Sequence, residues 1–373
     1  MAKAVYVGVG SKAHKMKKAY IGIGGKARKV KKMYIGVGGK ARLCYSAELE
    51  KVGMATALST TRYDMRAATV GKYALFAGGY ISKSSFGYSV SSSVDAYNTS
   101  LTKSTPTELS CKRCGHAAAS VGGYALFAGG ASSYNFLGYG KPVSSVDAYD
   151  ASLTRSAAHI IGATVAIGGA AVGNYALFAG GTVYSQINED NVTSDVLAYD
   201  PSLTFTTAPL LSVARAGVKG ASVGNYALFA GGRADGFCTT VDAYNASLTR
   251  TTATALSSTK NNSAAATVGN HAIFVGNTAS ADIYDASLTK TSAAILSTAR
   301  TGLAATTVGD YAIFSGGGVA DFCDASLTRS SIGTSMTGYD MGAATIGDYA
   351  LFAGGHSGEK SDTAYDSVEV YTA

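Results

Sequence analysis

Apolar and small residues recur along most of this chain with a long, regular period. The clearest unit of the pattern is Tyr73-Ala-Leu-Phe-Ala-Gly-Gly79. Six further copies begin at Tyr124, Tyr175, Tyr226, His271, Tyr311 and Tyr349, and those at 271 and 311 have drifted most. The spacings are 51, 51, 51, 45, 40 and 38 residues, so one connection inside a constant unit varies in length. A period this long indicates a repeat architecture.

Each unit carries four short strand patterns, which we call A, B, C and D. In the second unit they span 116–121, 124–129, 145–149 and 154–157. A Gly-containing turn joins A to B and is typical of a tight hairpin. Asp150 opens the connection from C to D, where its side chain can close the turn onto its own backbone. The equivalent residues are Asn98, Asp200, Asn245, Asp285 and Asp324, so the Asn-x-Ser motifs at 98 and 245 favour turns over glycan acceptors.

Seven such units predict a closed ring, because a four-stranded sheet with two apolar faces must stack on neighbours. The last unit stops after strand C at 368–371 and lacks a strand D. A matching strand precedes the first unit at 49–52. We therefore expect residues 46–373 to form one seven-bladed β-propeller, closed by strand 49–52, which removes an open sheet edge.

The units resemble the kelch repeat. The likeness rests on the apolar strand that ends in Gly-Gly, on a basic residue before strand A, and on a Tyr in strand C at 97, 149, 199, 244, 284 and 371. Kelch units usually carry a Trp entering strand D, and this chain contains no Trp. The resemblance implies an all-β, kelch-like propeller, a fold that serves both enzymes and binding modules.

Residues 1–45 form a separate, basic segment. They carry twelve Lys or Arg and no acid, so the rest of the chain has a net charge of about −5 although the whole chain has +7. A 14-residue Gly-rich repeat predicts small β units that cannot bury a core alone and must pack on a partner or on copies of themselves. The residues expected to make these attachment contacts are Tyr6, Tyr20, Tyr34, Lys26, Arg28, Lys40 and Arg42.

Tandem Tyr-Ile-Gly-Val-Gly-Gly-Lys-Ala-Arg units resemble those that open many bacteriophage and prophage tail-associated proteins. The resemblance implies that residues 1–45 attach the chain to other tail or baseplate proteins of a virion, after assembly in the cytoplasm of a host bacterium. We expect multiple copies per particle. The Gly-rich turns lack the Walker spacing, which argues against a nucleotide site. Basic strands with interleaved Tyr would also suit nucleic acid, which is the less favoured partner.

The sequence argues against a secretory signal, a membrane span and a disulfide framework. The Lys-bearing start lacks the continuous apolar segment of a secretory signal. The uncharged stretch at 156–188 keeps the repeat register and contains six Gly, so we expect no membrane insertion. Five Cys without regular spacing argue against a disulfide framework and favour a reducing compartment.

The connections from strand B to strand C are the first candidate ligand site. They are long in units 7, 1, 2 and 3, which are neighbours in a closed ring. Aromatic planes beside Asn, Asp and Glu suit sugar rings. The alternative is that these loops fold onto each other or onto a neighbouring subunit. The candidate residues are Tyr80, Phe86, Tyr88, Tyr134, Asn135, Phe136, Tyr139, Tyr184, His356 and Tyr365.

A set of cations before strand A is the second candidate. It comprises Arg62, Arg113, Arg215, Lys260 and Arg300. As a ring near the axis, these residues could hold an anionic polymer or sugar. The alternative is structural, because an Arg at a strand end readily caps carbonyl groups of the adjacent blade.

Little else in the sequence points to chemistry. Cys111 and Cys114 with His116 resemble half of a metal site, but no second Cys pair follows. No paired carboxylates and no arrangement of nucleophile, His and acid stand out. We expect no metal, no cofactor and no catalytic residue. The sequence favours a non-enzymatic tail protein that recognises a host-surface glycan or receptor; the alternatives are a purely structural virion protein and a propeller enzyme acting on such glycans.

Overall fold

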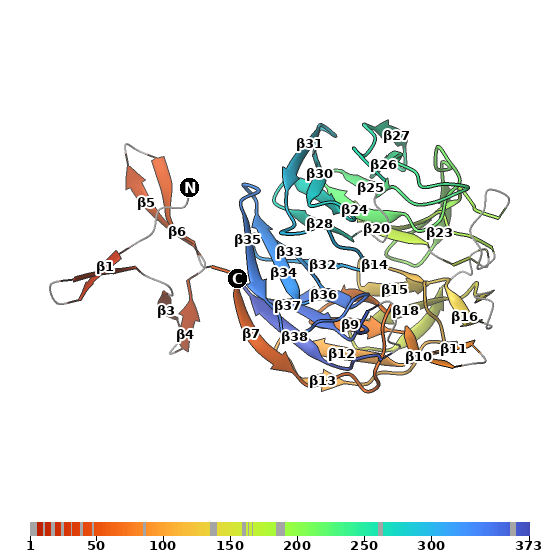
Figure 1. The fold of residues 1–373 in the computed structure, drawn as a ribbon, viewed down its shortest axis with the longest axis horizontal. Helices are drawn as coiled ribbons and strands as arrows, with labels where there is room; N and C mark the ends of the chain where they lie inside the picture. Colours follow the sequence, from red (N-terminus) through yellow and green to blue (C-terminus); the bar gives the residue numbers. More distant parts are fainter. Residues whose placement is uncertain are drawn as a thin grey trace.

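The computed structural model describes residues 48–373 apart from 85–86, 135–139, 159–161, 163, 166, 184–190, 260–263 and 359–362, and six strands and two connecting residues within 1–46. Every regular element in these residues is a β-strand. Seven four-stranded antiparallel sheets are arranged in a ring (Figure 1). This arrangement confirms the predicted all-β, seven-bladed propeller.

Each blade runs from an innermost strand A to an outermost strand D. The A strands are β8 (Arg66–Val70), β14 (Ala117–Val121), β20 (Gly168–Val172), β24 (Lys219–Val223), β28 (Ala264–Val268), β32 (Ala304–Val308) and β36 (Gly342–Ile346). The B strands are β9 (Tyr73–Ala77), β15 (Tyr124–Ala128), β21 (Tyr175–Ala179), β25 (Tyr226–Ala230), β29 (His271–Val275), β33 (Tyr311–Gly316) and β37 (Tyr349–Ala353). The C strands are β12 (Val94–Asn98), β18 (Val146–Asp150), β22 (Val196–Tyr199), β26 (Val241–Asn245), β30 (Ser280–Asp285), β34 (Val319–Asp324) and β38 (Val368–Thr372). The D strands are β13 (Lys103–Ser104), β19 (Arg155–Ala158), β23 (Phe205–Ala208), β27 (Arg250–Ala253), β31 (Lys290–Ala294), β35 (Arg329–Gly333) and β7 (Glu50–Ala55).

The apolar pair in the middle of each strand B interlocks neighbouring blades. Side chains alternate between the two faces of a strand, so Leu75 of β9 lies in one buried cluster with Phe127 of β15. The same pairing continues with Leu126 and Phe178, Leu177 and Phe229, Leu228 and Phe274, Ile273 and Phe314, Ile313 and Phe352, and finally Leu351 and Phe76. Burial of one such side chain contributes about 1.5–3 kcal/mol. The core therefore lies between blades, and no blade holds it alone.

Strand β7 completes the seventh blade. It pairs antiparallel with β38, with Glu50 opposite Thr372 and Ala55 opposite Val368. The sequence predicts a closing strand at 49–52, and in the structure the strand begins one residue later and extends to residue 55. Lys51 Nζ lies 2.5 Å from Glu369 Oε1, whose side chain is fully buried.

The turns from strand C to strand D hold a leucine in the left-handed backbone region. In the second blade Leu153 has φ 66°. Asp150 Oδ1 accepts hydrogen bonds from the backbone N–H groups of Ser152 and Thr154, at 2.8 and 2.9 Å. The same Asx turn, predicted from the sequence, is made by Asn98, Asp200, Asn245, Asp285 and Asp324. These hydrogen bonds offset the strained backbone, which costs roughly 1–3 kcal/mol.

The Gly-Gly pair after strand B allows the next blade to approach closely. A Cβ added to Gly78 would lie 2.4 Å from the carbonyl oxygen of Arg113. The N–H of Gly79 donates to that same oxygen at 2.8 Å. Any larger residue at position 78 would push the two blades apart.

Hydroxyl groups link the innermost strands into what we call the hydroxyl belt. Each hydroxyl donates to a backbone carbonyl of the preceding innermost strand, as Ser120 does to Thr69 at 2.7 Å. The other donors are Thr69, Ser222, Thr267, Thr307 and Thr345. The third blade has Ala171 at this position, so it contributes no hydroxyl to the belt.

The long loops of the first two blades fold onto each other. They form a separate sheet in the order β10 (Tyr80–Ser84), β11 (Gly87–Val90), β16 (Ala131–Tyr134) and β17 (Gly140–Pro142). Strands β11 and β16 meet with Tyr88 opposite Tyr134.

Each 14-residue repeat of the amino-terminal segment forms one two-stranded hairpin. The hairpins are β1 (Tyr6–Val9) with β2 (Lys12–Lys15), β3 (Tyr20–Ile23) with β4 (Lys26–Lys29), and β5 (Lys32–Val37) with β6 (Lys40–Ser46). The sequence predicts these small β units because its Gly-rich turns separate short strand patterns.

Candidate ligand site at the mouth of the channel

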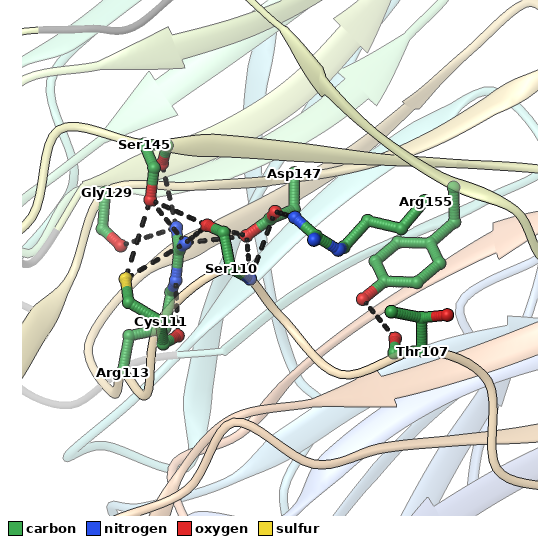
Figure 2. Close-up of polar contacts among 9 residues, drawn as sticks. Thr107, Ser110, Cys111, Arg113, Gly129, Ser145, Asp147 and Arg155 are labelled. Atoms are coloured by element: carbon green, nitrogen blue, oxygen red, sulfur yellow. Dashed lines mark hydrogen bonds and ion pairs between the residues drawn. The ribbon is translucent and has the colours of Figure 1, made fainter.

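Arg113 lies inside the second blade, where Figure 2 shows its contacts. Its Nη2 lies 2.6 Å from Asp147 Oδ2, and both side chains are fully buried. Its Nη1 donates to the carbonyl oxygen of Ser145 at 2.8 Å. Asp147 also accepts a hydrogen bond from the N–H of Ser110 and pairs with Arg155 of β19 at 2.8 Å. We call this set of Ser, Arg, Asp and strand D cation the blade network.

The blade network supports the structural alternative for the cations before strand A, and not a ring near the axis that holds an anionic ligand. Equivalent pairs are Arg62 with Asp95, Arg215 with Asp242, and Arg300 with Asp321. The side chains of Arg62 and Arg215 are fully buried, and that of Arg300 is 8% exposed. Each guanidinium is paired within the blade it precedes, because strand C of that blade supplies the carboxylate. Lys260 lies outside the described residues.

The third blade replaces the charged members of the network with uncharged ones. Leu197 stands where the other C strands have a carboxylate, Phe205 where the D strands have a cation, and Thr164 where most loops have Arg. The ring of Phe205 lies 5.9 Å from that of Tyr199, centroid to centroid. The charged network of the other blades and the uncharged residues of the third blade thus occupy equivalent positions in the propeller.

The buried tyrosines of strand C tie the same connections to the blade. The hydroxyl of Tyr149 donates to the carbonyl oxygen of Thr107 at 2.8 Å. Tyr97 and Tyr244 make equivalent bonds to Thr56 and Pro209. Burial raises the pKa of these phenols, so they stay protonated donors.

The predicted loop residues divide into two groups. The structure describes Tyr80, His356 and Tyr365, and it pairs the backbones of Tyr88 and Tyr134 between β11 and β16. Outside the described residues lie Phe86, Asn135, Phe136, Tyr139 and Tyr184.

The innermost strands surround a central channel, and aromatic rings from the first and seventh blades gather beside it. Tyr80 stacks on Tyr63 with ring centroids 5.1 Å apart and planes inclined by 26°. His356 lies 4.6 Å from Tyr63 and 6.2 Å from Tyr339. We call Tyr63, Tyr80, Tyr339 and His356 the aromatic cluster. The sequence pattern pointed to Tyr80 and His356 but not to the two tyrosines that precede strand A.

A cavity of about 640 Å³ opens at the same end of the channel. Its wall consists of the first residues of the innermost strands and the loops before them, so small residues such as Ala117 and Gly168 leave the space open. Phe237, 47% exposed, lines it as well. Its charged lining residues are Asp64, Arg66, Lys219, Arg233 and Asp340. A volume of this order is typical of small-ligand sites.

Two aspartates at the cavity adopt a backbone conformation that favours glycine. Asp64 and Asp340 both have φ 52°, whereas three of the other five blades have glycine at this position, namely Gly115, Gly217 and Gly302, with φ between 59° and 70°. A non-Gly residue held in this region costs roughly 1–3 kcal/mol, and such strain clusters at functional sites. The carboxylates at this position are therefore the strongest local signal of a site.

Both carboxylates are held by defined partners. Asp64 Oδ1 lies 2.7 Å from Arg66 Nη1, and Asp64 Oδ2 accepts a hydrogen bond from the N–H of Gly115 at 3.1 Å. Asp340 Oδ2 lies 3.1 Å from His356 Nε2. Burial alone would raise the pKa of Asp340, but the contact with His356 and the charges of Lys219 and Arg66 lower it overall. Asp340 is therefore ionised at neutral pH and connects the cavity to the aromatic cluster.

The half-site of Cys and His residues in the second blade is part of the core. Cys114 and His116 are fully buried, and burial raises the pKa of the Cys114 thiol. Within the described part of the chain, no group of three or more His, Cys, Asp or Glu side chains could hold a metal ion. Both ring nitrogens of His116 are buried without a hydrogen-bond partner among these residues.

We expect His116→Met to stabilise the protein, most strongly in acid. In five of the six other blades the equivalent residue is apolar, namely Met65, Ile167, Val218, Leu303 and Met341, and the fifth blade has Ser263. Unsatisfied buried polar atoms cost about 1–3 kcal/mol, which the substitution would recover. Burial, with nearby Arg113, holds the pKa of His116 well below its usual value, so the unfolded chain binds the extra proton below pH ~6.5. Urea unfolding at pH 7.5 and 5.0 should show a gain that grows at pH 5.0; an equal gain at both pH values would contradict a neutral His116.

The structure describes little of the predicted attachment residues. Tyr34 is 57% exposed. The backbones of Tyr6, Tyr20, Lys26, Arg28, Lys40 and Arg42 lie in hairpin strands, and their side chains are outside the described part of the structure.

In the described residues, no helix is long and apolar enough to cross a membrane. No family model matches the chain, and no curated protein matches its sequence. The classification that its own structure supports is that of a seven-bladed β-propeller.

Proposed function

We propose that this propeller is a carbohydrate-binding module of a bacteriophage tail-associated protein. The aromatic cluster beside the channel-mouth cavity carries the proposal. Stacked Tyr63 and Tyr80 offer ring faces for the C–H surface of a sugar, and Asp64 and Asp340 offer acceptors for hydroxyl groups close by. In this proposal residues 1–45 attach the chain to other virion proteins, which rests on the resemblance of their repeats and on their positive charge.

A purely structural virion protein is the second candidate. It is favoured by the pairing of β11 with β16, because backbone groups of two of the long loops pair with each other and not with a ligand. A glycan array and a turnover assay on isolated host cell wall separate the possibilities. Binding without turnover supports a binding module, turnover supports an enzyme, and neither supports the structural role.

We expect Tyr63→Ala to weaken glycan binding roughly tenfold, because a stacked aromatic face contributes about 1 kcal/mol or more. Tyr80→Ala should weaken it similarly. Affinity is measured by titration with the glycan that gives the strongest array signal, and an unfolding curve confirms that each variant is folded.

The matched control is Tyr34→Ala, which removes an exposed tyrosine from the amino-terminal segment. A second variant, Tyr134→Ala combined with Phe136→Ala, tests the loops of the second blade. If this variant loses binding while Tyr63→Ala keeps it, the site lies in the loops and not at the aromatic cluster.

A further inference from the structure

The channel-mouth cavity is lined by more cationic than anionic side chains. Arg66 is paired with Asp64, and Asp340 is paired with His356. Lys219, the first residue of β24, lines the same cavity from the fourth blade. No carboxylate of the described residues lies within ion-pair distance of Lys219 Nζ. The cavity therefore holds a half-buried cation without a direct counterion among them.

Position 219 also differs from its equivalents in the ring. Five innermost strands begin with a small residue, namely Ala117, Gly168, Ala264, Ala304 and Gly342. The other two begin with Arg66 and Lys219, and both are cations. A fold that accepts Ala or Gly at this position does not need a cation there for packing, so these two charges are candidates for ligand contact.

A third cation lies on the same wall as Lys219. Arg233 follows strand β25 of the fourth blade, and its guanidinium lies over the Phe237 ring, 5.5 Å from the centroid. Arg233 and the exposed Phe237 thus give the fourth-blade side of the cavity a charged group next to an aromatic face.

We propose that the ligand carries an anionic group, a carboxylate or a phosphate, which enters the cavity and binds Lys219 with Arg66 and Arg233 beside it. This inference rests on the proposed function and narrows it to acidic saccharides, such as uronic acids, or phosphate-bearing ones. The shared chemistry is an oxyanion, for which an ammonium group supplies charge-assisted hydrogen bonds.

The electrostatics of the cavity agree with such a ligand. Burial lowers the pKa of Lys219, and the charge of Arg66 lowers it further, whereas Asp64 and Asp340 offset part of this effect. Taking a cation out of water is costly unless a counterion is bound. A bound oxyanion would supply that counterion, and the cavity of about 640 Å³ has room for a small saccharide around it.

The test is calorimetric titration of the full chain with glucuronate, glycerol phosphate, inorganic phosphate and neutral glucose. The variant is Lys219→Ala, which copies Ala117, Ala264 and Ala304 of other blades, with Lys72→Ala as the control. Lys72 is exposed in the turn from β8 to β9, at the opposite end of the blade, and its replacement removes the same charge. We expect at least one anionic probe to bind, and Lys219→Ala to weaken it tenfold or more while Lys72→Ala changes it less than twofold.

Each outcome decides the proposal. Glucuronate binding alone indicates an acidic sugar, and binding of both phosphate probes indicates a phosphate-bearing ligand. Anion binding that Lys219→Ala leaves intact overturns the inference, as does a failure of all three anions to bind at about 10 mM, on the order of the weakest specific affinities. Glucose binding in the absence of anion binding would support the carbohydrate-binding function and contradict the proposal of an anionic ligand.

Discussion

Removal of residues 1–55 is expected to destabilise the propeller by at least about 3–5 kcal/mol, whereas removal of residues 1–47 should leave its unfolding curve unchanged. The longer deletion takes away β7, so β38 becomes an open edge and the fully buried Glu369 loses Lys51. The lost pairing of β7 with β38 and the loss of Lys51 from Glu369 together account for that cost. Urea and thermal unfolding of the two truncated chains measure the difference.

A synthetic peptide of residues 48–57 provides the matched rescue. Added in excess to the chain that lacks residues 1–55, it should restore the unfolding midpoint by binding along β38. The same peptide with Lys51→Met should restore less, because it leaves Glu369 without a cation. Equal stability of the two truncated chains would show that β7 does not hold the ring closed.

Asp242→Leu should reduce the free energy of unfolding by about 3–5 kcal/mol, because it leaves Arg215 buried without a counterion. Adding Arg215→Thr and Arg250→Phe to the same chain should recover more than half of that loss. The triple variant copies Thr164, Leu197 and Phe205 of the third blade, where the uncharged set already exists. Replacing a whole buried ionic set is far less costly than breaking one.

Arg250→Ala alone is the control, since its side chain is 30% exposed and such pairs contribute about 1 kcal/mol or less. Urea unfolding of the single, triple and control variants decides the question. A triple variant less stable than Asp242→Leu would mean that the two sets are not interchangeable between blades.

The fold could be predicted from the sequence because its main contacts repeat in register. The consecutive Leu and Phe of strand B point to opposite faces of the sheet, so each blade packs on a neighbour on both sides. Repetition of the same unit therefore predicts a closed ring. The Asx turn was predictable for the same reason, since one short motif specifies it locally. Kelch ancestry and the viral setting stay predictions that rest on resemblance.

The blade network was harder to predict because its partners come from separate parts of each unit. A structural role for the cation before strand A was among the alternatives, but the sequence did not identify the Asp of strand C as its partner. The signal was present in the sequence as the repeated Val-Asp-Ala-Tyr of 94–97, 146–149 and 241–244. In this motif an Asp stands in the middle of a strand that is otherwise apolar and expected to be buried. An Asp at such a position requires a buried cation.

The candidate site depends on contacts that periodicity cannot supply. Tyr80 and His356 belong to variable loops, and their aromatic character suggested a ligand. Their partner Tyr63, and the left-handed Asp64, lie in a connection between blades whose shape follows from closure of the ring. Lys219 becomes notable through comparison with the small residues that begin the other innermost strands.

The third blade weakens one contact in the ring of innermost strands. It contributes no hydroxyl to the belt, because Ala171 cannot donate to the carbonyl of Ser120, so the contact between β14 and β20 lacks a hydrogen bond that the other six contacts have. Among the contacts between innermost strands, the one between β14 and β20 should therefore open most readily. Opening of this contact would leave the aromatic cluster, on the first and seventh blades, undisturbed.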